Sequence, residues 1–131
     1  MKNQNHFLIG IVLSALILIS RPVLVLAQDP LEVGPDIYKL VFENERVRVL
    51  DAQFKSGSKI AMHSHPDHFA YVLASGNMRL SYPDGTTKDI EAKVGDVMWI
   101  NAETHAGENI GTTDVHLLVV ELKEPQPGKG G

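Results

Sequence analysis

The chain has 131 residues, with 16 Asp and Glu against 12 Lys and Arg, and it contains no cysteine. A net charge of −4 argues against a nucleic-acid-binding surface, and the missing cysteines exclude disulfides, thiolate metal ligands and a thiolate nucleophile. Any chemistry must therefore come from histidines, carboxylates or a bound ion, within one domain of modest size.

Residues 1–27 have the pattern of a secretory signal peptide: Lys2 precedes an apolar run over residues 7–20, and small residues suited to cleavage end at Ala27. The Arg21-Pro22 pair interrupts the apolar stretch before it reaches the roughly 20 residues of a membrane-spanning helix. An uncleaved anchor that bends at the proline is the alternative, and only then would the protein contact a membrane. Either way we expect an exported protein, periplasmic or secreted, and cleavage would change the net charge from −4 to −6, because both lost charges are positive.

The remaining 104 residues predict an all-β domain. Residues 28–35 are expected to form a linker, residues 36–123 a β-barrel, and residues 124–131 a disordered Pro/Gly-rich tail. The apolar/polar alternation predicts strands over Tyr38–Phe42, Val47–Phe54, Ile60–Ser64, Phe69–Ala74, Asn77–Tyr82, Thr86–Ile90, Asp96–Asn101, His105–Asn109 and Val115–Leu122. Pro83-Asp84-Gly85 and Ser75-Gly76-Asn77 predict hairpin turns. Strands of this number favour a sandwich or a closed barrel.

Three histidines predict a metal site on this sheet. His63 and His65 are two residues apart, so on a strand both side chains leave the same face and can bind one ion. His105 would complete a facial trio. Neutral imidazole is the commonest side-chain ligand and suits Zn, Fe, Ni and Cu.

The residues around these histidines resemble the two motifs of a single-domain cupin, a jelly-roll barrel also described as a double-stranded β-helix. The first motif is Gly57, five residues, His63-Ser64-His65, three residues, Phe69, six residues and Gly76. The second begins at Gly95 and reaches His105 and, three residues later, Asn109. The resemblance covers roughly residues 47–122, and two glycine-framed motifs with a hairpin between them are far more specific than His-x-His alone.

The sequence departs from the cupin pattern at several positions. Phe69 stands where the family has a glutamate ligand, Asn101 and Glu103 replace a proline and a glycine, and His105 comes one residue early. Without the glutamate, the resemblance implies an ion held by three neutral imidazoles with open positions for a chelating substrate and O2 or water. Cupins with three-histidine iron sites, such as thiol dioxygenases and diketone-cleaving enzymes, are similar. We therefore expect Fe(II), with Mn, Ni, Zn and Cu as alternatives, and a dioxygenase-like oxidation of a small organic anion.

Further residues are weaker candidates for this site. His68 could supply a fourth nitrogen if a turn or bulge reverses its side chain, whereas alternation from an inward-facing Phe69 would place it on the rim or surface. Asn109 and Asp67 could orient an imidazole through its free N–H. Pocket-lining candidates are Tyr71, Tyr82 and Arg79, the last of which could attract an anion.

Three other interpretations stay open from the sequence. The histidines could line the barrel as polar residues without a metal. The domain could be a noncatalytic module that binds a small ligand or a metal, since the usual glutamate is absent and Glu103 is expected to be solvent-exposed. It could also be an oligomerising barrel, a homodimer in which residues 36–42 lie on a partner's sheet edge. The expected partner is thus a small molecule, with a second copy of the chain in the homodimer alternative, and nucleic acid is not expected.

Overall fold

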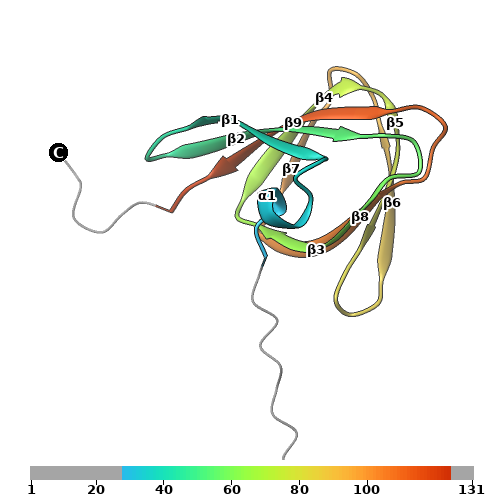
Figure 1. The fold of residues 1–131 in the computed structure, drawn as a ribbon, viewed down its shortest axis with the longest axis horizontal. Helices are drawn as coiled ribbons and strands as arrows, with labels where there is room; N and C mark the ends of the chain where they lie inside the picture. Colours follow the sequence, from blue (N-terminus) through green and yellow to red (C-terminus); the bar gives the residue numbers. More distant parts are fainter. Residues whose placement is uncertain (1–27, 125–131) are drawn as a thin grey trace, which may run out of the picture.

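A computed structural model describes residues 28–124, so the predicted signal peptide and all but the first residue of the predicted tail lie outside the described residues. The described part contains nine strands and one helix (Figure 1). In chain order they are α1 (Pro30–Val33), β1 (Tyr38–Glu43), β2 (Val47–Phe54), β3 (Lys59–His65), β4 (His68–Ala74), β5 (Gly76–Ser81), β6 (Thr87–Ala92), β7 (Val97–Ile100), β8 (Glu103–Asn109) and β9 (Val115–Leu122). All nine predicted strands are confirmed, and the bounds of β2 and β9 are those predicted.

The strands form two antiparallel sheets that face each other and enclose the core (Figure 1). One sheet has the order β1-β2-β9-β4-β7, and the other has the order β3-β8-β5-β6. The hairpin of β1 and β2 extends away from the barrel together with the end of β9 (Figure 1). This arrangement confirms the all-β barrel.

The core lies on the inner faces of the two sheets. On β2 the inner positions are Leu50, Ala52 and Phe54, and on β9 they begin with Val115 and continue at every second residue. Burial of these apolar side chains is the main force that holds the sheets together. The outer face of the five-stranded sheet is also apolar in large part, with exposed side chains that include Phe42, Tyr71, Leu73, Val97 and Trp99.

The segment of residues 28–35, which we expected to form a linker, contains helix α1. Asp29 caps the helix by accepting a hydrogen bond from the Leu31 N–H at 2.8 Å, and Pro30 occupies the first helical position. An acidic N-cap followed by proline is a standard helix start, but a four-residue helix leaves no periodic pattern to detect. Among residues 28–124, no helix is long and apolar enough to cross a membrane.

One of the two predicted hairpins is wrong. β4 and β5 flank Ser75-Gly76-Asn77 but belong to different sheets, so this segment crosses between the sheets. Gly76 is needed there for space, since an added Cβ would lie 2.4 Å from Val115 Cγ2. At the other join, Gly85 has a φ of +85° between the paired strands β5 and β6, as the predicted turn requires.

Candidate metal centre

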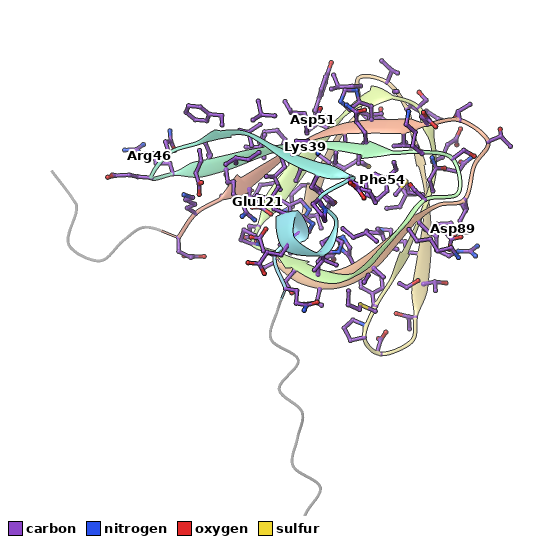
Figure 2. All side chains as sticks on the ribbon, viewed as in Figure 1. Lys39, Arg46, Asp51, Phe54, Asp89 and Glu121 are labelled. Carbon is purple, nitrogen blue, oxygen red and sulfur yellow. The ribbon has the colours of Figure 1, made fainter. Side chains whose placement is uncertain are left out.

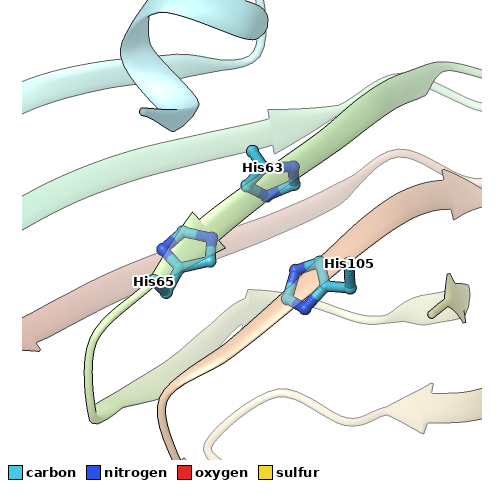
Figure 3. Close-up of side chains that lie close together, drawn as sticks. All are labelled: His63, His65 and His105. Atoms are coloured by element: carbon cyan, nitrogen blue, oxygen red, sulfur yellow. The ribbon is translucent and has the colours of Figure 1, made fainter. Parts of the chain in front are cut away.

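Strands β3 and β8 bring the three predicted ligands together. They pair so that His63 and His105 are directly opposite each other, and a register shift between Ile60 and His63 accompanies the pairing. His65 lies two residues further along the same inner face. Ligand nitrogens of the three side chains all lie within 4.8 Å of one another, and all three residues are buried (Figure 3). This group could hold a metal ion.

A fourth histidine lies beside the trio. His68, the first residue of β4, is only 2% exposed, and its ring centroid lies 4.7 Å from that of His65. The predicted strand orientation is therefore wrong: His68 faces inward with Ala70 and Val72, while Phe69 and Tyr71 face outward. The physical reason is that β4 packs its smaller side chains against the core and leaves the larger ones on the apolar outer face.

Hydrogen bonds place all four imidazoles in the same tautomer. The Nδ1–H groups of His63 and His68 donate to the carbonyl oxygens of Ala61 and Pro66, both at 2.8 Å. Those of His65 and His105 donate to carboxylate oxygens of glutamates at 2.6 and 2.7 Å. Because Nδ1 carries the proton in each ring, each Nε2 keeps a free lone pair, which is the arrangement that a metal ligand requires.

The residues fit a metal ion in two further respects. His63 Nε2 is buried and has no hydrogen-bond partner, and a buried polar atom of this kind is costly unless something binds it. Burial also lowers the pKa of His63 to about 4 and, with the nearby histidines His65 and His68, that of His105 to about 3. Both side chains are therefore neutral at physiological pH, the form that binds metal.

Sequence reasoning did not identify Glu121 as part of the site. Glu121 is 2% exposed on the inner face of β9, accepts the Nδ1–H of His65, and accepts the Nε–H of Arg48 at 2.6 Å. Burial alone would raise the pKa of Glu121, but these two hydrogen bonds outweigh it and lower the pKa. The residue is thus an anion next to the histidines.

Glu103 supplies the second carboxylate of the centre. It begins β8, and its side chain is 24% exposed and accepts the Nδ1–H of His105. The expectation that Glu103 is solvent-exposed in a loop is wrong, because the strand begins two residues earlier than predicted. The cupin glutamate would have supplied a carboxylate as a direct metal ligand. In this protein the carboxylates instead bond to two of the ligands, His65 and His105.

Neither proposed orienting residue contacts an imidazole. Asn109 is fully buried, but its amide donates to the carbonyl oxygens of Phe54 and Thr113, and its Oδ1 accepts the Gly111 N–H. It fixes the loop between β8 and β9. Asp67 accepts the Ala102 N–H at 2.7 Å and so joins two loops. Both residues satisfy backbone groups, as buried or turn polar side chains commonly do.

None of the three predicted pocket-lining residues is among those that line the cavity, although one lies near His105. Tyr71 is 38% exposed on the outer face of β4, opposite in phase to His68. Arg79 forms a two-point ion pair with Asp89 on the exposed side of the β5–β6 hairpin. Tyr82 has its ring centroid 6.5 Å from that of His105. Strand alternation determines the first two positions, because both side chains point away from the core.

The histidines line a small cavity between the sheets, with a volume of about 60 Å³. Apart from the four imidazoles and Tyr38, the side chains that line it are apolar: Phe54, Ala70, Met78, Leu80, Ile90, Ala92, Met98, Ile100, Leu117 and Val119. No Lys, Arg, Asp or Glu is among these lining residues. The cavity thus offers nitrogen ligands at one side and an uncharged, largely apolar surface elsewhere.

Comparison with solved structures shows the same architecture. A cupin domain from Bordetella pertussis has a TM-score of 0.62 at 23% identity, over 67% of this chain and 93% of that chain. A protein with a double-stranded β-helix domain from Klebsiella pneumoniae has a TM-score of 0.55 at 23% identity, over 72% and 79% of the two chains. A predicted oxalate decarboxylase from Thermotoga maritima has a TM-score of 0.51 at 23% identity, over 66% and 79%.

The chain therefore has the cupin fold, the double-stranded β-helix that the two sequence motifs suggested. Compared as a sequence, it matches no protein family and no curated protein. At these identities the structural likeness establishes the fold and not an activity. Fold and site together define a cupin-fold protein with a buried three-histidine group that could hold a metal ion.

Proposed function

We propose that the protein binds one divalent metal ion through His63, His65 and His105, with His68 as a fourth nitrogen ligand. The observation that carries this proposal is the three-histidine group, whose ligand nitrogens lie within 4.8 Å of one another. The hydrogen bonds at Nδ1 leave Nε2 free in these rings and in His68, which lies beside them. An all-imidazole set suits Fe, Ni, Cu and Zn, and we favour Fe(II), with Mn as a further possibility. The carboxylates that accept hydrogen bonds from His65 and His105 support binding of a dication, because they place negative charge beside these two ligands and fix their orientation.

We further propose that this centre carries out an O2-dependent oxidation of a small organic molecule. A bound Fe(II) ion would supply the redox chemistry with O2. The lining contains no carboxylate that could act as a general acid or base, so the protein's own contribution is to hold the ion, exclude water and limit the size of the substrate.

The cavity modifies the expectation of an anionic substrate. Arg79 lies outside it, and no cationic side chain lines it. An anionic group on the substrate would therefore bind next to the ion itself, and its remaining part would contact apolar side chains such as Met78 and Met98. The preferred substrate is accordingly a small chelating molecule with an apolar body.

The size of the cavity favours a second candidate function, a noncatalytic module that stores or carries a metal or a small ligand. A volume of about 60 Å³ is smaller than the roughly 150 Å³ of an engineered cavity that holds benzene. In this alternative the same four histidines bind the metal and no organic molecule reacts there. Turnover assays on the metal-loaded protein separate the two functions.

Elemental analysis of the protein, purified without chelators and without a metal-binding tag, tests the metal proposal. We expect a metal content close to one ion per chain, which the double variant His63→Ala/His65→Ala abolishes. His116→Ala is the matched control, because His116 lies on the outer face of β9 and bonds Asp51; it should retain the metal. A wild-type protein that stays metal-free after reconstitution with each candidate ion would exclude the proposal.

Export and self-association remain separate predictions. The intact mass of the purified protein tests cleavage after Ala27, because cleaved protein begins at Gln28. Gel filtration tests the homodimer, and a monomer would contradict it.

A further inference from the structure

The environment of Glu121 is unusual for a position inside a β-barrel. The other inner residues of β9 are Val115, Leu117 and Val119, and all are buried in the apolar core. A carboxylate in the same row carries a large desolvation penalty unless it is paired. Burial of Glu121 would thus oppose folding unless its two oxygens have partners.

Both oxygens of Glu121 have a partner on a different strand. Oε1 accepts the Nδ1–H of His65 on β3, which belongs to the opposite sheet, and Oε2 accepts the Nε–H of Arg48 on β2. Arg48 lies directly across from Glu121 in the β2–β9 pairing. Glu121 therefore links the two sheets next to His65, one of the candidate metal ligands. Figure 2 labels Glu121 on the ribbon.

The chain of contacts continues to the N-terminal segment. Arg48 also forms an ion pair with Asp29, whose other carboxylate oxygen caps helix α1. The carbonyl of Gln28 accepts the backbone N–H of Ser64, the residue between the two β3 ligands, at 2.9 Å. The guanidinium of Arg48 lies between the carboxylates of Asp29 and Glu121 and forms an ion pair with each of them.

Glu121 selects one of the two histidines within its reach. His68 lies directly across from it in the β4–β9 pairing, yet the Nδ1–H of His68 donates to Pro66. Because Glu121 accepts the Nδ1–H of His65 instead, it fixes both the tautomer and the orientation of that ring. The Nε2 lone pair of His65 is left facing the other imidazoles.

We propose that Glu121, held by Arg48 and through it by Asp29, is the positioning residue of the metal centre: it keeps His65 in the Nδ1–H tautomer with Nε2 directed at the ion. The link of this role to metal affinity rests on the function proposed above. The tautomer itself does not depend on that function, and it can be measured without metal.

The first test is a long-range ¹H–¹⁵N NMR spectrum of the metal-free wild-type protein. We expect His65 to carry its proton on Nδ1. In Glu121→Gln the signal should show a mixture of tautomers, since a neutral amide selects the tautomer less strongly than a carboxylate. Protonation on Nε2 of His65 in the wild-type protein would overturn the proposal even if no variant folds.

The second test is titration with Co(II) alone, followed by its absorption spectrum. Glu121→Gln should weaken Co(II) binding by roughly 10–100-fold, the usual effect of removing a residue that orients a ligand, and should change the spectrum. Asp29→Asn should cause a smaller loss, because it acts through Arg48. A change in spectrum separates positioning from a general loss of stability.

Asp51→Asn provides the matched control. Asp51 also pairs with a histidine across β2 and β9, but on the outer face, so affinity and spectrum should not change. Equal Co(II) affinity and an identical spectrum for Glu121→Gln and the wild type would refute the positioning role. A wild-type protein that binds neither Co(II) nor any other candidate ion would instead refute the proposed function, while the tautomer measurement still decides the role of Glu121.

Discussion

Strand β9 takes part in two carboxylate–histidine pairs, one on each face. On the inner face Glu121 pairs with His65, and the two side chains are 2% and 1% exposed. On the outer face His116 pairs with Asp51, and these side chains are 34% and 23% exposed. The pairs contain the same groups, but only the inner one lies beside three further imidazoles. Convergence and burial, and not the pair itself, distinguish the candidate site.

The largest expected difference between the two faces is in metal binding. His105→Ala removes a ligand, so its loss of affinity should exceed the roughly 10–100-fold typical of an orienting residue. His116→Ala removes a histidine from the outer face and should leave the affinity unchanged. Calorimetric titration with Zn(II) measures both values, and a similar loss in the two variants would show that the ion binds elsewhere.

The two faces should also differ in how much their ion pairs stabilise the fold. Arg48→Met leaves Glu121 as a buried charge without its guanidinium partner, which should lower the free energy of unfolding by about 3–5 kcal/mol. Asp51→Asn breaks the partly exposed outer pair and should cost less than about 1 kcal/mol. Urea unfolding measures both, and equal losses would mean that Glu121 finds another partner when Arg48 is absent.

A third difference concerns the pH dependence of the metal-free protein. His63 has its pKa lowered from 6.5 to about 4, so between these values the unfolded chain takes up a proton that the folded chain does not. The free energy of unfolding should therefore fall as the pH decreases from 6.5 to 4, by about 3 kcal/mol for this residue. Below about 4 the contribution of His63 should stop changing.

The variant His63→Leu tests the assignment of this pH effect. It should have a shallower dependence over the same range than the wild-type protein. Glu121 and Asp51 have lowered pKa values and lose their stabilising contributions at lower pH, below the unfolded value of a carboxylate. A wild-type slope in His63→Leu would contradict the buried neutral imidazole.

Much of the fold and half of the site could be predicted from the sequence. Glycines that separate alternating segments located the strands, and Gly57 and Gly95, which open the two motifs, adopt φ values of +77° and +90° in turns before β3 and β7. His63 and His65 share a face because a strand has period two. His105 could be added because the motif spacing placed it on a separate strand of the same barrel.

The remainder could not be predicted because the outer face of the five-stranded sheet is apolar as well. On β9, Leu118, Val120 and Leu122 lie on the outer face, so the alternation does not show which residues point inward. The same ambiguity concealed the inner position of His68. The available signal for Glu121 was its opposite charge to Arg48, which lies across from it on the inner face. This signal can be recognised only after the pairing of β2 with β9 is known.

The smallest effect that we expect concerns β4, which has His68 on its inner face and Tyr71 on its outer face. His68→Ala should weaken Co(II) binding by about tenfold, equivalent to about 1.4 kcal/mol, because the other three imidazoles still hold the ion. The Co(II) spectrum should change, since one nitrogen ligand is replaced by solvent. Tyr71→Ala, on the outer face of the same strand, should alter neither quantity. If His68→Ala keeps both the affinity and the spectrum of the wild type, the centre has three protein nitrogens, and the hydrogen bond to Pro66 alone explains why His68 is buried.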